Sequence, residues 1–289
     1  MAISCNCEVT PRVYSYGNST PEIPVGDQRK RIEDEEYLND RTIGQMDLPV
    51  CESIGTSAFE NSSITGIYAP KCTTVEDRAF YGCSSFTANS IEMDSLTTIG
   101  NYAFKSVTIG NTHGPLVVNL SNVVTIGNYG LYGSDIARSL GDEWTLPNCT
   151  RIGEGGFRGT VDSNESKASK IYLPAIVEIG EQAFRGWGVT GSSDSEFELH
   201  IGPNCTHIGG GILSYGYMAG HKIDIYVEAI NPPVLDSPGF GDVIPNWEPR
   251  HIYVPTQSLQ AYKDTSVWSR YNKESGSDPG QNIFQPIPT

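Results

Sequence analysis

The chain has 289 residues, with 31 Gly, 18 Pro and a formal net charge of -15. This acidity argues against nucleic acid or anionic membrane as a ligand, because binding to phosphates needs clustered Lys and Arg. No window approaches the roughly 18 apolar residues that span a bilayer, and the glycine and proline content favours short strands and turns over long helices.

The first 40 residues resemble none of the segments that follow. Cys5 and Cys7 form a C-x-C pair without a second half, which is too little for a zinc site. Residues 1–7 lack both the basic and the apolar regions of an export signal. We therefore expect residues 1–40 to cap the first end of the molecule or to lead to an anchor.

Residues 41–221 contain one motif in seven variants. Successive copies start 21, 24, 27, 26, 27 and 29 residues apart, which is the range of leucine-rich repeats. The copies are IGTSAF from Ile54, VEDRAF from Val75, IGNYAF from Ile99, IGNYGL from Ile126, IGEGGF from Ile152, IGEQAF from Ile179 and IGGGIL from Ile208.

The sixth residue of every copy is large and apolar, and it predicts a stacked core row that no single repeat could bury alone. The row comprises Phe59, Phe80, Phe104, Leu131, Phe157, Phe184 and Leu213. Gly or Asn usually follows two residues later, as at the end of a short helical turn. Upstream of each motif, a short segment of period two predicts a parallel strand.

Four cysteines align with apolar residues of other repeats, three residues before the motif. Cys51, Cys72, Cys149 and Cys205 take the place that Leu96, Val123 and Ile176 occupy elsewhere. They are predicted to be small core residues rather than disulfide or metal ligands. The five His are scattered and show no metal spacing. No catalytic arrangement and no cofactor motif is identifiable.

After the last motif, residues 222–274 contain two more predicted strands at Ile225 and Ile252. A short helix follows, with Leu259, Tyr262 and Trp268 on its apolar side and Thr256 or Ser258 as a possible cap. This helix is expected to cover the last repeat. Residues 275–289 are rich in Gly, Pro and Ser, and we expect a flexible tail or a segment laid along the body.

The string L-P-x-x-x-x-I-G-x-x-A-F-x-G resembles the repeat of BspA-type leucine-rich-repeat proteins, which are bacterial surface proteins. The resemblance implies a mainly β solenoid, a right-handed coil with a parallel strand ladder, short helical turns and a C-terminal capping helix. It also implies a secreted or surface location, a part in adhesion to a host or neighbouring cell, and no cofactor.

Outward positions of the predicted ladder of about nine strands give the candidate binding face. They are Asp47, Tyr68, Glu92, Asn119, Thr145, Tyr172, His200, Tyr226 and Tyr253. Tyrosine offers a large contact area and a hydroxyl at little rotamer cost. The ligand-face hypothesis rests on Tyr68, Glu92, Asn119, Tyr172, His200, Tyr226 and Tyr253, whose ligand is a protein or a glycan. Tyrosine also simply favours strands.

Two alternatives to a binding module stay open. A β-helix enzyme acting on acidic polysaccharide would need clustered catalytic groups, but Asp47, Glu92 and His200 are dispersed along the chain. A structural component of a phage particle or an envelope array is the other alternative, and it would form a defined oligomer. The sequence predicts neither the ligand nor the oligomeric state.

Overall fold

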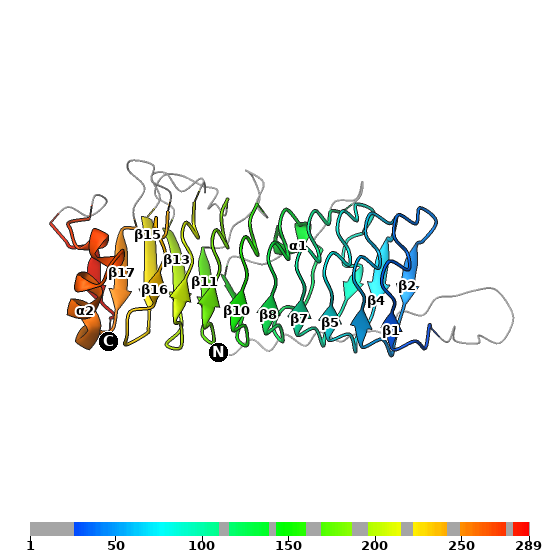
Figure 1. Ribbon diagram of the computed structural model, residues 1–289, viewed down its shortest axis with the longest axis horizontal. Helices are drawn as coiled ribbons and strands as arrows, with labels where there is room; N and C mark the ends of the chain where they lie inside the picture. Colours follow the sequence, from blue (N-terminus) through cyan, green and yellow to red (C-terminus); the bar gives the residue numbers. More distant parts are fainter. Residues whose placement is uncertain are drawn as a thin grey trace, which may run out of the picture.

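The protein is an elongated solenoid of short parallel strands (Figure 1). The computed structural model describes residues 26–109, 116–138, 143–159, 169–186, 196–214, 222–241, 249–275 and 280–288. Along one side runs a nine-stranded parallel sheet. Its strands are β1 (Arg31–Ile32), β3 (Ser53–Ile54), β5 (Thr74–Val75), β7 (Thr98–Ile99), β8 (Thr125–Ile126), β10 (Arg151–Ile152), β12 (Glu178–Ile179), β14 (His207–Ile208) and β16 (Val234–Leu235).

The strands predicted upstream of the motifs form two further parallel sheets instead of one ladder. The first contains β2 (Gln45–Asp47), β4 (Gly66–Tyr68) and β6 (Ile91–Glu92). The second contains β9 (Glu143–Thr145), β11 (Lys170–Leu173), β13 (Glu196–Ile201), β15 (Lys222–Val227), β17 (His251–Val254) and β18 (Phe284–Pro286). Residues 116–120 lie between the two sheets and belong to neither, so the parallel ladder is present but the strand predicted at this repeat is absent.

The core lies between these sheets and the turns that close each coil. All seven residues of the predicted apolar row are fully buried, which confirms the row. Phe59 stacks on Phe80 with ring centroids 5.1 Å apart, and Phe80 stacks on Phe104 at 5.2 Å. Each ring therefore completes its burial against the coil above and the coil below, as a solenoid requires.

Two coils lie outside the seven motif copies. At the N-terminal end, Ile32 pairs with Ile54, and Tyr37 stacks on Phe59 at 5.1 Å. At the other end, Leu235 pairs with Ile208, and Phe240 is buried five residues later. Residues 31–38 are thus a divergent coil, which corrects the view that the first 40 residues match no repeat. Acidic residues replace the motif's glycine and alanine there and hide the similarity.

The segments expected as short helical turns are instead runs of tight turns with left-handed residues. The fourth motif residue has positive φ, as in Tyr102 (57°) and Tyr129 (55°), and so does the eighth, as in Asn61 (54°) and Gly82 (70°). In this arrangement the N–H of Phe59 donates to Ala79 of the next coil, whereas the N–H of Glu60 donates back to Ser57. Alternate amides thus bond between coils and within them, which an α-helical turn would not allow.

The glycine at the second position of the motif is required by close packing between coils and not by an unusual φ. A Cβ at Gly100 would lie 2.6 Å from the carbonyl carbon of Glu76, and a Cβ at Gly180 would lie 2.4 Å from the backbone nitrogen of Glu154. A side chain at either position would push two coils apart. This accounts for the recurrence of glycine at the bend after six of the nine strands of this sheet.

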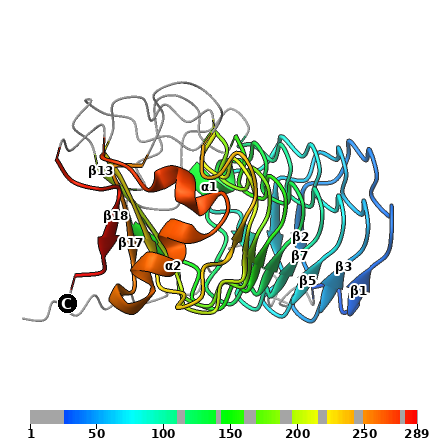
Figure 2. The same ribbon diagram turned by 60° about the vertical axis from the view of Figure 1, so that its left-hand side comes forward.

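The predicted cap covers the C-terminal end of the solenoid (Figure 2). It consists of a 3-10 turn η1 (Thr256–Ser258), helix α2 (Leu259–Asp264) and a second 3-10 turn η2 (Trp268–Tyr271); the other helix described, α1 (Asp135–Arg138), lies in mid-chain. The Tyr262 hydroxyl donates to the carbonyl of Ala229 at 2.7 Å, and Trp268 Nε1 donates to the carbonyl of Pro233 at 2.7 Å. Neither Thr256 nor Ser258 caps α2 through its side chain, contrary to expectation.

The C-terminal segment pairs with the solenoid instead of extending away from it. Strand β18 pairs with β17 in parallel, with Ile252 opposite Phe284. Ile283 and Phe284 are both buried. The expectation of a flexible tail is therefore wrong for residues 283–286. Ile283 and Phe284 are surrounded in the sequence by Gly, Pro and polar residues, so the composition of the segment does not indicate a buried strand.

Candidate functional site

Four residues of the predicted ligand face form one continuous stack on the six-stranded sheet. Strand register places Tyr172, His200, Tyr226 and Tyr253 side by side. The ring centroids are 4.4, 4.2 and 4.5 Å apart in that order, with interplanar angles of 23°, 4° and 12°. We call these four residues the aromatic ladder.

The stacking decides which part of each ring a ligand can reach. Centroid spacings near the 4.8 Å distance between strands mean that the ring planes lie across the solenoid axis. Neighbouring rings therefore cover one another's faces, and the ladder presents ring edges, with the tyrosine hydroxyls, to the outside. Such a surface is suited to hydrogen bonding and to contact with electronegative atoms, because ring edges carry partial positive charge.

A row of charged side chains runs beside the ladder, two residues earlier in the strands. Lys170 Nζ lies 3.6 Å from Glu143 and 3.6 Å from Glu198, and Glu198 also contacts His200 Nε2 at 3.0 Å. The opposite charges in this row largely neutralise one another. The Glu198 contact fixes the imidazole within the stack.

This charged row ends, beside Tyr226 and Tyr253, in a buried ionic cluster. Asp224 and His251 are 3% and 5% exposed. Asp224 accepts two hydrogen bonds from Arg250, one of them from Nε at 2.9 Å, and lies 3.5 Å from His251 Nδ1. The hydrogen bond from Arg250 to the Asp224 carboxylate raises the pKa of Arg250 above its ordinary value. The cluster holds β15 and β17 in register and so aligns Tyr226 with Tyr253.

Burial raises the pKa of Tyr226 to about 12, and the negative charge of Glu198 adds to the effect. A tyrosine hydroxyl is protonated at neutral pH even at its ordinary pKa, and the raised pKa keeps this hydroxyl a hydrogen-bond donor at more alkaline pH. A tyrosine in the centre of the ladder is thus held as a neutral donor.

The other predicted face residues lie apart from the ladder. Tyr68 is 38% exposed and pairs with Glu92 in the three-stranded sheet. Glu92 and Asn119 border a shallow hollow of about 280 Å³ at the interruption between the sheets. The predicted face is therefore two separate surfaces, because the interruption and β9 separate Tyr68 from Tyr172.

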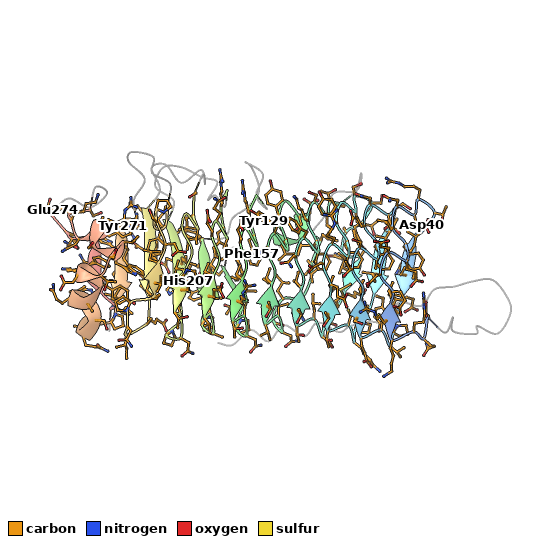
Figure 3. All side chains as sticks on the ribbon, in the orientation of Figure 1. Asp40, Tyr129, Phe157, His207, Tyr271 and Glu274 are labelled. Atoms are coloured by element: carbon orange, nitrogen blue, oxygen red, sulfur yellow. The ribbon has the colours of Figure 1, made fainter. Side chains whose placement is uncertain are left out.

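A second cluster of aromatic residues lies on the turns that close the coils, and the ligand-face hypothesis missed it. Tyr102 stacks on Tyr129 at 5.2 Å, and Tyr129 meets the edge of Tyr132 at 6.0 Å. Lys105 Nζ lies 5.5, 5.2 and 4.9 Å from the ring centroids of Tyr81, Tyr102 and Tyr132. Figure 3 labels Tyr129 at the upper edge of the body and Phe157 within it. Aligning the fourth and seventh motif residues would have revealed this surface.

The cysteines of the core are free thiols. Cys51, Cys72, Cys149 and Cys205 are buried, as predicted, and Cys83 is buried as well. Burial raises the pKa of Cys72, Cys149 and Cys205 to about 12. Cys5 and Cys7 lie outside the described residues. Within the described ranges, no group of three or more His, Cys, Asp or Glu residues could hold a metal ion.

The repeated coil, its buried rows and its strand register define a leucine-rich-repeat solenoid. Residues 9–137 match the family model described as BspA type Leucine rich repeat region, in six copies. Residues 9–137 therefore match repeats of the BspA type. That match includes the divergent coil at residues 31–38, which the visible motif does not reveal.

Comparison with curated proteins finds no match. Among solved structures, the chain is similar to a leucine-rich repeat protein from Bacteroides ovatus, with 14% sequence identity and a TM-score of 0.42. The similarity covers 78% of this chain and 58% of the other. None of the helices in the described ranges is long and apolar enough to cross a membrane.

Proposed function

We propose that this protein is a non-catalytic binding module and that the aromatic ladder is the centre of its binding face. The observation that carries the proposal is the continuous stack of Tyr172, His200, Tyr226 and Tyr253 on an ordered sheet. Rigid aromatic side chains bind at little cost in conformational entropy, and tyrosine is enriched at the centres of protein interfaces.

The geometry of the ladder favours a protein over a glycan. Sugar rings commonly pack on exposed aromatic faces, but here the inner rings cover one another at 4.2 to 4.5 Å. Ring edges and hydroxyls match the carbonyl groups and side chains of a polypeptide. Leucine-rich-repeat domains generally bind proteins, which supports the same choice.

The match to BspA-type repeats supports a location at the bacterial surface. BspA-type leucine-rich repeats are associated with bacterial surface proteins, so the partner is a protein of a host or of a neighbouring cell, and the binding event is adhesion. Protease added to intact bacteria that produce the protein should remove it. Complete protection, with a cytoplasmic marker also intact, would contradict a surface location and leave the ladder proposal unaffected.

The ladder is tested by replacing Tyr172, Tyr226 and Tyr253 with Ser and measuring capture on an array of host extracellular proteins and glycans. The exposed Tyr68, outside the stack, supplies the matched control Tyr68→Ser. We expect the triple variant to lose the protein signals while the control retains them, with similar circular dichroism spectra for both. Undiminished capture by the triple variant, or signals on glycans alone, would refute the proposal.

A conservative variant separates the hydroxyls from the rings. Replacing the same three tyrosines with Phe preserves the stack and removes the donors. If the hydroxyls bind the partner, the Phe variant should bind at least about tenfold more weakly, equivalent to about 1.4 kcal/mol. Binding equal to wild type would assign the contact to the ring edges alone.

A further inference from the structure

The turns carry a cationic surface on an otherwise acidic protein. The seventh motif residue forms a column along successive coils, and three of its members are cations. They are Lys105, Arg158 and Arg185, with Tyr132 between the first two. We call these four residues the cationic turn surface.

Two of its cations have aromatic rather than acidic partners. Lys105 and Arg158 both lie over the ring of Tyr132, with 4.9 Å and 5.7 Å to its centroid. Among the described residues, no carboxylate lies within ion-pair distance of either one, whereas Arg78 pairs with Glu60. The chain carries 34 acidic and 19 basic side chains, so two uncompensated cations on one ring are unusual for this surface.

Two carboxylates on the same turns, Glu154 and Glu181, accept hydrogen bonds from other groups. Glu154 accepts a hydrogen bond from the hydroxyl of Tyr129, which raises the pKa of Tyr129 to about 12. Glu181 accepts one from Gln182 at 3.1 Å. Gln182 in turn accepts from Arg158 at 3.0 Å and from Arg185 at 2.7 Å, and so holds the two guanidinium groups side by side.

We propose that the cationic turn surface is a second interaction site, separate from the aromatic ladder, and that it takes an acidic polypeptide segment. Carboxylates of the segment pair with Lys105 and Arg158, while its backbone or side chains contact the Tyr132 ring. A long polyanion such as a sulfated glycan or a nucleic acid is disfavoured, because beyond this surface it would meet the acidic remainder of the protein.

The probe is fluorescein-labelled decaglutamate, followed by fluorescence anisotropy with the full chain at about 0.1 M salt. At that ionic strength the Debye length is about 10 Å, so repulsion from distant acidic residues is damped. The test variant is Lys105→Met/Arg158→Met. The control variant, Lys30→Met/Lys71→Met, makes the same change in net charge at exposed lysines elsewhere.

We expect wild type and control to bind decaglutamate alike, and the test variant to bind about tenfold more weakly. Three outcomes would overturn the proposal: no binding by wild type, equal weakening in both variants, or binding of a heparin fragment without binding of decaglutamate. Thermal unfolding of each variant shows that the fold is intact. Replacements in the aromatic ladder should leave decaglutamate binding unchanged. This experiment therefore tests the cationic turn surface independently of the proposed function of the ladder.

Discussion

The buried aromatic row gives a prediction that can be worked out from the structure. Phe104 is fully buried and stacks on Phe80 with centroids 5.2 Å apart. Replacing Phe104 with Ala removes the ring's transfer free energy and leaves a cavity, for an expected loss of about 3 to 5 kcal/mol. The stacked pair accounts for about 0.5 to 1.5 kcal/mol beyond its buried area.

Leucine is the matched control, because the chain itself has Leu131 and Leu213 in the same row. Phe104→Leu keeps most of the apolar volume and should cost about 1 kcal/mol. Urea unfolding followed by circular dichroism gives the midpoints. Because each coil contacts only its neighbours, amide hydrogen exchange should quicken most in the coils of Phe80 and Leu131. Equal midpoints for the Ala and Leu variants would refute the stacked core.

Three further predictions follow from other parts of the molecule. In the variant Cys5→Ser/Cys7→Ser, the five buried thiols should resist 5,5′-dithiobis(2-nitrobenzoic acid) until urea unfolds the protein; rapid labelling would place a thiol at the surface. The pKa of Glu60 is lowered by its hydrogen bond with Arg78, so its stabilisation is full above the unfolded pKa of about 4.5 and lost as pH falls through the lower folded pKa. Melting temperatures should then fall less between about pH 7 and pH 3 in Glu60→Gln than in wild type, and parallel curves would exclude this linkage. Deleting residues 276–289 exposes the edge of β17, so size-exclusion chromatography should show concentration-dependent association, whereas a monomer at all concentrations would contradict it.

The sequence predicts the fold well wherever one repeat resembles the next. Phe59, Phe80 and Phe104 occupy the same position of the motif, which requires a shared environment, and the structure places all three in one stack. The cysteines followed from the same alignment. The divergent coil at residues 31–38 was missed because Tyr37 replaces phenylalanine and charged residues replace the small ones, although packing at the end of the solenoid accepts both changes.

The candidate site was predictable only in part. Alternation within strands identified Tyr172, Tyr226 and Tyr253 as outward residues, but ring stacking depends on exact strand register. The interruption at residues 116–120, which separates Tyr68 from the ladder, depends on how unequal coils pack and leaves no motif. The cationic turn surface was missed because the seventh motif residue varies from Glu60 through Tyr81 to Lys105, so it has no shared residue type that marks it as a row.

The most direct test of the ladder as the binding face is site-specific photo-crosslinking. Benzoylphenylalanine placed at Tyr226, in the centre of the stack, is compared with the same residue at Tyr68, and each protein is irradiated with the array protein that wild type captures. The proposed function predicts a crosslinked product from position 226 and little from position 68. A product from position 68 alone, at equal folding of the two proteins, would contradict it.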